Sequence, residues 1–183
     1  MAITDYKKVF SEYHRGPKPF IHLSSKPTSA SRDAAIQQDD PEKLKAAIDK
    51  SAKNISTKIV FYGSHITDKA MQLNQLAKQT KRSICFIDCQ QLVDNYIGET
   101  EKHLSRLIAQ AESENWILFF DEADALFGKR SNVKDAHDRY ANLETNDVFH
   151  RLSHTSSLAI LSIAEKPKLG IIQYAVDSVI SFR

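Results

Sequence analysis

Five short apolar runs constrain the fold of this chain more than any other feature. The runs lie at residues 58–62, 83–87, 116–120, 158–163 and 178–182, and most residues in each run are apolar and adjacent to one another. Consecutive apolar residues predict strands that are buried on both faces, which is typical of parallel sheets. Amphipathic helical patterns separate the runs. We therefore expect an α/β fold in which helices cover both faces of a five-stranded parallel sheet.

The helical patterns are apolar residues at helical spacing, and they begin at residue 41. Asp40 and Pro41 suit the cap and the first position of a helix. The apolar positions that follow are Leu44, Ala47 and Ile48, then Ala70, Leu73, Leu76 and Ala77, then Leu104, Leu107, Ile108 and Ala111, and less regularly Tyr140 to Leu152. Residues 1–40 read differently, as a short helix over 3–14 and a Ser/Pro-rich linker. We expect one α/β domain over residues 41–183.

A degenerate phosphate loop follows the first run. Residues 63–70 read G-S-H-I-T-D-K-A, and the phosphate-loop pattern is G-x-x-x-x-G-K-[ST] between a strand and a helix. Gly63 and Lys69 are in register with that pattern. Asp68 stands at the second glycine, and Ala70 stands at the hydroxyl residue. The chain has 5 glycines in 183 residues, under half of the usual ~7%, so a glycine-rich loop has few residues to draw on.

An acid pair, Asp121 and Glu122, follows the third run. An apolar strand that ends in two acids is typical of a nucleotide-hydrolysing site. There the first acid holds Mg²⁺ and the second orients the attacking water. The alternative is a strand that simply ends in solvated acids. Ligands of parallel sheets bind at the carboxyl ends of the strands, where both motifs are expected.

The order of these motifs resembles the core domain of the AAA+ ATPases. Residues 95–102, N-Y-I-G-E-T-E-K, and residues 121–130, D-E-A-D-A-L-F-G-K-R, carry the likeness, and residues 133–142 resemble more narrowly the AAA ATPases of contractile injection systems and phage-tail-like particles. The resemblance implies a P-loop NTPase-like three-layer sandwich and ATP with Mg²⁺ as the cofactor. It implies catalytic roles for Glu122 and Asp121, Mg²⁺ binding by Asp121, and phosphate binding by Gly63, Thr67, Asp68, Lys69 and Ala70.

Several positions depart from the family pattern. The family loop resembles G-P-P-G-T-G-K-T, so Ile66 and Asp68 replace two glycines, and Ala70 lacks the hydroxyl that ligates Mg²⁺. Ala164 falls where a polar sensor residue is expected, and residues 173–178 contain no arginine finger. The chain stops at Arg183, so we expect the helical lid domain to be absent. These departures predict weakened nucleotide binding and lost hydrolysis, with Lys69 paired to Asp121 instead.

Three functions remain open from the sequence. The first is a pseudo-ATPase that acts as a scaffold or regulatory subunit on a protein partner, either a complete AAA+ ATPase or an injection-system component. The second is an ATP-binding, weakly hydrolysing AAA ATPase that remodels or threads a protein. The third is a binding module without a ring, which uses the Tyr96 loop and Lys129-Arg130. The resemblance implies that Tyr96, Ile97 and Gly98 form a substrate-gripping pore loop; the alternative is that Tyr96 packs within its loop. A homo-oligomer also stays open.

Composition and charge exclude other classes. The net charge is +2, and no basic run alternates with aromatic residues, so we expect no nucleic-acid partner. The apolar runs are too short to span a membrane, and the N-terminus lacks the apolar core of a signal, so we expect a cytoplasmic protein. Cys85 and Cys89 are expected as ordinary buried thiols. His150 and His154, four residues apart, are expected on a solvated helix face and not at a zinc ion.

Overall fold

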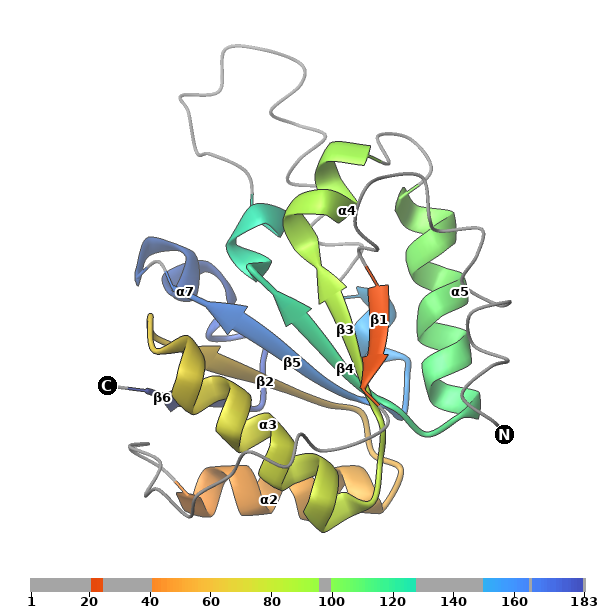
Figure 1. Ribbon diagram of the computed structural model, residues 1–183, viewed down its shortest axis with the longest axis vertical. Helices are drawn as coiled ribbons and strands as arrows, with labels where there is room; N and C mark the ends of the chain where they lie inside the picture. The colour runs from red at the N-terminus through yellow and green to blue at the C-terminus, as the bar shows by residue number, and fades with distance from the viewer. Residues whose placement is uncertain (1–20, 25–40, 96–99, 128–149, 165, 183) are drawn as a thin grey trace.

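A six-stranded sheet forms the centre of the molecule, in the order β1-β3-β4-β5-β2-β6 (Figure 1). The computed structural model describes residues 21–24, 41–95, 100–127, 150–164 and 166–182. The strands are β1 (Ile21–Ser24), β2 (Thr57–Tyr62), β3 (Ile84–Asp88), β4 (Ile117–Asp121), β5 (Leu158–Ile163) and β6 (Ser178–Ser181). Strands β2 to β6 are all parallel, which confirms the predicted five-stranded parallel sheet.

Helices cover the sheet on both faces, as predicted. Helices α2 (Pro41–Ala52) and α3 (Ile66–Thr80) pack on one face, where their apolar residues meet alternate residues of the strands. The opposite face is covered by α4 (Cys89–Asn95), α5 (Thr100–Ser113) and α7 (Lys166–Ile172), together with the 3₁₀ helix η2 (Ala123–Leu126). All six residues of β5 are buried, because this strand lies inside the sheet between two helical layers. The result is a three-layer sandwich.

Strand β1 is a feature that the sequence did not predict. It lies in the stretch interpreted as a linker, and it pairs antiparallel with β3, with Ile21 opposite Ile87 and Ser24 opposite Ile84. Its four residues are flanked by serine and proline, so their local pattern is that of a loop. The strand exists because the outer edge of β3 offers unpaired backbone groups. The domain boundary at residue 41 stays a prediction.

The short helices α4 and α7 were also not predicted, because neither has more than two turns of apolar spacing. The expected helix over 3–14 lies outside the described residues. Of the irregular pattern that ends at Leu152, the described residues 150–153 are helical. Over the described parts of the chain, none of the helices has the length and apolar character to cross a membrane.

Candidate functional site

The carboxyl ends of β2, β4 and β5 bring most of the predicted site residues to one edge of the sheet. Gly63 follows β2 directly, and Asp121 is the last residue of β4. Lys69, from the first turns of α3, lies within electrostatic reach of Asp121 and Asp124. The expectation that the two motifs meet at this edge is therefore confirmed.

Gly63 is required by the protein's own backbone. Its φ is +126°, which side-chain-bearing residues rarely adopt, and its N–H donates a hydrogen bond to the Ile163 carbonyl at 3.0 Å. A Cβ added at this position would lie 2.3 Å from the carbonyl oxygen of Phe182. The glycine thus lets β2 turn tightly between β5 and the segment after β6.

Helix α3 begins early, at Ile66, three residues before Lys69. Ile66, Thr67 and Asp68 therefore have a helical backbone and do not form an extended loop. The replacement of glycine at 66 and 68 explains this, because non-glycine residues favour helical angles over the left-handed angles of a phosphate-wrapping loop. The Ile66 side chain is 79% exposed. His65 caps the helix without a side-chain hydrogen bond, and Ala70 is exposed.

Lys69 is buried, with 5% of its surface exposed, and its ammonium group is bonded within the fold. Nζ donates to Ser162 Oγ at 3.0 Å and to the Ile163 carbonyl at 3.4 Å. Burial lowers the pKa of Lys69, while the carboxylates of Asp121 and Asp124 raise it. The predicted Lys69–Asp121 salt bridge is wrong: among the described residues, Asp121 acts on Lys69 only at longer range.

Ser162 is a site residue that the sequence analysis missed. It is the one hydroxyl in the apolar strand L-A-I-L-S-I, and it is 7% exposed. Its position beside Phe61 of β2 places the hydroxyl under the first turns of α3, where Lys69 reaches it. The signal that could have identified Ser162 is that it is the one polar residue in an otherwise apolar strand, near the carboxyl end where ligands of such sheets bind.

The acids at this edge are already engaged in local contacts. Asp121 Oδ1 accepts a hydrogen bond from the Glu122 N–H at 3.1 Å, and Glu122 itself has a left-handed backbone with φ 50°. Asp124 Oδ2 accepts from the Ala164 N–H at 2.8 Å. Ala164, which stands at the expected sensor position, thus contributes its backbone N–H to this contact with Asp124. Both acids of the D-E pair are exposed at the strand end.

Asp88 adds a further carboxylate beside Asp121 in the strand register, and it accepts hydrogen bonds from the backbone and side-chain nitrogens of Gln91. The thiol of Cys89 lies beneath these acids. Burial first, and then Asp121, Asp88, Glu122 and Asp124, raise the pKa of Cys89 well above its usual value. Across the described ranges, no group of three or more acids, histidines and cysteines is arranged to hold a metal ion. Both cysteines are buried, free thiols, as predicted.

Other predicted residues lie outside the described parts of the chain. These are Tyr96, Ile97 and Gly98 of the expected pore loop, and Lys129 and Arg130. Their roles stay predictions.

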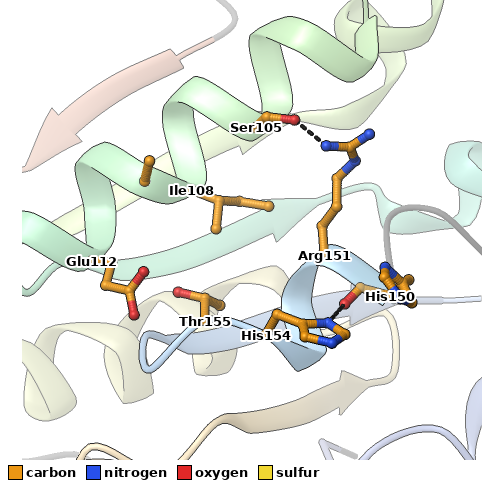
Figure 2. A pocket seen from close by; sticks show the side chains of 8 residues that line it. Ser105, Ile108, Glu112, His150, Arg151, His154 and Thr155 are labelled. Carbon is orange, nitrogen blue, oxygen red and sulfur yellow. Dashed lines mark hydrogen bonds between the residues drawn. The ribbon is translucent and has the colours of Figure 1, made fainter.

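A separate pocket of about 350 Å³ lies between α5 and residues 150–155. Figure 2 shows Ser105, Ile108 and Glu112 projecting from α5 toward Arg151, His154 and Thr155. Its polar groups are largely paired: Arg151 donates to Ser105 Oγ, and Glu112 accepts from Ser156. His154 Nδ1 donates to the His150 carbonyl at 2.7 Å, because a carbonyl can only accept. Both histidines are exposed, as expected for a solvated helix face.

The strand order, the turn from β2 into α3, and the acids after β4 together define a domain of the P-loop NTPase fold. A model of the ATPase family associated with various cellular activities (AAA) matches residues 59–168. The chain therefore belongs to the AAA family.

Similar proteins include the ATPase family gene 2 protein of Schizosaccharomyces pombe, 29% identical over 112 residues, covering 60% of this chain and 14% of that protein. The peroxisomal ATPase PEX6 of Saccharomyces cerevisiae is 32% identical over 79 residues, covering 43% and 8%. The proteasome-activating nucleotidase 1 of Haloferax volcanii is 35% identical over 81 residues, covering 44% and 20%. The matched region thus spans a fifth or less of each of these relatives.

Among solved structures, the crystal structure of the FIGL-1 AAA domain superposes with a TM-score of 0.62 at 15% identity. The superposition covers 96% of this chain and 61% of that one. At this identity, the likeness establishes the shared fold.

Proposed function

We propose that this domain is a pseudo-ATPase: it has the AAA fold, does not turn over ATP, and serves as a scaffold or regulatory subunit for a protein partner. The observation that carries the proposal is the environment of Lys69. In a phosphate loop this lysine reaches the β- and γ-phosphates. Here its ammonium group bonds to Ser162 and Ile163, so the fold satisfies it without a phosphate.

The residues present do not fit MgATP, the ligand that the family implies. A triphosphate is held by successive backbone N–H groups of a glycine-rich loop. From Ile66 onward the backbone is helical, so Thr67 and Asp68 belong to the helix and not to such a loop. Asp68 adds a negative charge in the first turn, and Ala70 has no hydroxyl for Mg²⁺.

Calorimetric titration with MgATP tests the proposal. We expect no binding by the wild-type chain at millimolar nucleotide, and binding by a variant with Ile66→Gly, Asp68→Gly and Ala70→Thr, which restores the loop pattern. The matched control adds Lys69→Ala to the restored variant, and this change should remove the gained binding. Wild-type binding of MgATP, with turnover abolished by Glu122→Gln, would contradict the proposal.

The second candidate is an ATP-binding, weakly hydrolysing AAA ATPase that remodels or threads a protein. Asp121 and Glu122 at the end of β4, with Lys69 within electrostatic reach, favour it. The comparison of the wild-type chain with Glu122→Gln distinguishes the two candidates. If the wild-type chain hydrolyses ATP and the variant does not, the second candidate is supported; if neither hydrolyses ATP, the first is supported.

For the partner, we propose a complete AAA+ ATPase or a component of a contractile injection system, in the cytoplasm. The support is the family membership together with the sequence likeness over residues 133–142. Light scattering of the chain alone and with such a component tests this. A complex supports the proposal. A monomer under both conditions favours instead a binding module without a ring.

A further inference from the structure

Two histidines, His150 and His154, line the pocket between α5 and residues 150–155 (Figure 2). They are four residues apart in a helical segment, a spacing that places side chains on one face of a helix. Their ring centres lie 4.4 Å apart, and the angle between the ring planes is 42°. Both residues are exposed, so the two imidazoles can act together on a ligand that arrives from solvent.

Hydrogen bonding leaves each ring with a nitrogen for a ligand. His154 Nδ1 donates to the His150 carbonyl at 2.7 Å, so in the neutral ring Nε2 carries the lone pair. Histidines that bind metal ions typically donate their second N–H to a carbonyl or carboxylate in this way. Within the described parts of the chain, the ring nitrogens of His150 have no hydrogen-bond partner. The pair therefore offers two nitrogen ligands on one turn of helix.

The distance between the rings favours one coordination geometry. An ion bound to an imidazole nitrogen at about 2 Å lies about 3.2 Å from the ring centre. Two such ligands at a right angle place the ring centres about 4.5 Å apart, whereas a tetrahedral angle places them about 5.2 Å apart. The observed 4.4 Å matches the right angle. Square-planar or tetragonal coordination by nitrogen and oxygen ligands is typical of Cu²⁺, whereas zinc prefers a tetrahedral site.

The charges around the pair do not oppose a cation. Among the residues that line the pocket, Arg151 and Glu112 carry the permanent charges, which offset each other. Arg151 reaches α5, where it donates to Ser105 Oγ. The described residues contain no group of three or more metal-ligating side chains, so an ion held by the two histidines keeps water in its other positions.

We propose that His150 and His154 chelate one Cu²⁺ ion through one nitrogen of each ring, with water as the remaining ligands. The residues precede β5, so the site lies at the amino edge of the parallel sheet, opposite the carboxyl edge to which Lys69 belongs. The proposal is therefore independent of whether the domain binds nucleotide. Mg²⁺ should not bind here, because it requires oxygen ligands.

Calorimetric titration of the full-length chain with Cu²⁺, Zn²⁺ and Mg²⁺ tests the proposal. We expect Cu²⁺ to bind more tightly than Zn²⁺, and Mg²⁺ to give no signal at this site. His150→Ala and His154→Ala should each weaken Cu²⁺ binding by about tenfold or more, since even an outer-shell partner of a metal ligand contributes about that much. His65→Ala is the matched control, because His65 is exposed and has no histidine four residues away. Zinc binding as tight as copper binding, or an equal loss in all three variants, would overturn the proposal.

Nuclear magnetic resonance of the wild-type chain provides a second test that does not depend on the folding of a variant. A substoichiometric amount of Cu²⁺ should broaden the imidazole signals of His150 and His154 together and leave those of His65 sharp, because paramagnetic broadening falls steeply with distance. Broadening of one ring of the pair without the other, or of His65 to the same extent, would contradict a shared ion.

Discussion

At the scale of single residues, Gly63 and Lys69 are held by contacts within the protein. Both match the phosphate-loop pattern, and the sequence predicted their places at the strand edge. Their surroundings were not predictable from the pattern. The partner of Lys69 lies on β5, 93 residues away along the chain, and the contact of Gly63 lies beyond β6. A motif covers one segment of the sequence, whereas these contacts depend on the order in which distant strands lie in the sheet.

Gly63→Ala should destabilise the fold strongly. The added Cβ would meet the Phe182 carbonyl at 2.3 Å, at a backbone angle that alanine adopts only with strain. We expect a loss of about 2 kcal/mol or more in the free energy of unfolding, measured by urea denaturation. Gly170→Ala, in helix α7, is the control, because nothing lies within 4 Å of the position that the added Cβ would occupy. That change should be neutral or stabilise by roughly 0.5–1 kcal/mol, and equal effects would contradict our account.

Ser162→Ala should remove the hydroxyl that accepts from Lys69 and leave a buried ammonium group with a poorer partner. The expected loss is roughly 1.5–3 kcal/mol, the range for a hydrogen bond to a charged group. Ser153→Ala is a matched control, since Lys58 Nζ donates to Ser153 Oγ at 2.8 Å on the exposed surface. There water replaces the hydroxyl, so thermal denaturation should show little change. A comparable loss at both serines would argue against burial as the cause.

At the scale of elements, the five parallel strands were predictable because each is rich in apolar residues. Strands β2 to β5 are largely buried on both faces, and the edge strand β6, although mostly half-buried, still contains Val179 and Ile180. Strand β1 was not, because its pairing depends on an exposed backbone edge and its four residues, I-H-L-S, are too few to establish a strand pattern. The start of α3 was also missed. A loop was expected from the position of Lys69 in the motif, but Ile66 and Asp68 allow the helix to begin earlier.

Arg82 joins three segments at the amino edge of the sheet. It donates from Nε to the Asn115 carbonyl at 2.9 Å, from Nη1 to Ser51 Oγ at 2.8 Å, and from Nη2 to the Trp116 carbonyl at 3.0 Å. Its burial lowers the pKa of the guanidinium, and these acceptors offset that cost.

Arg82→Ala should therefore loosen the end of α2, the turn before β3 and the entry to β4 together. We expect a loss of about 2–3 kcal/mol in the free energy of unfolding, read from chemical denaturation. Arg106→Ala, at an exposed position of α5, serves as the control and should change stability by about 0.5 kcal/mol or less. If the two variants are equally stable, the three hydrogen bonds of Arg82 contribute nothing.

At the scale of the whole molecule, the buried thiols couple stability to alkaline pH. Burial raises the pKa of Cys85 from 9.0 to about 12. Above pH 9 the thiol ionises in the unfolded chain and stays protonated in the folded one. The unfolded state then binds fewer protons, so stability falls as pH rises from 9 toward 12.

Cys85→Ala should reduce this loss. Between pH 8 and pH 10, the wild-type chain should lose about 1 kcal/mol more than the variant, by the linkage of pKa shift to free energy. The buried Lys69, whose lowered pKa acts in the opposite direction, is common to both proteins and cancels in the difference. Denaturation curves at the two pH values measure it. Parallel losses in both proteins would show that Cys85 does not ionise on unfolding in this range.

The strand order also has a consequence for biosynthesis. Strand β2 lies between β5 and β6. Thr57 can therefore pair with Leu158, and Tyr62 with Ser181, only after these later residues have been synthesised. Strands β3 and β4, by contrast, pair across a shorter connection that contains helices α4 and α5. Contacts between residues far apart in sequence slow folding, because loop closure precedes the gain from pairing. On the ribosome, the β3–β4 unit can assemble early, whereas β2 has no neighbour in the sheet until β5 has emerged and lacks its second neighbour until Ser181 has emerged.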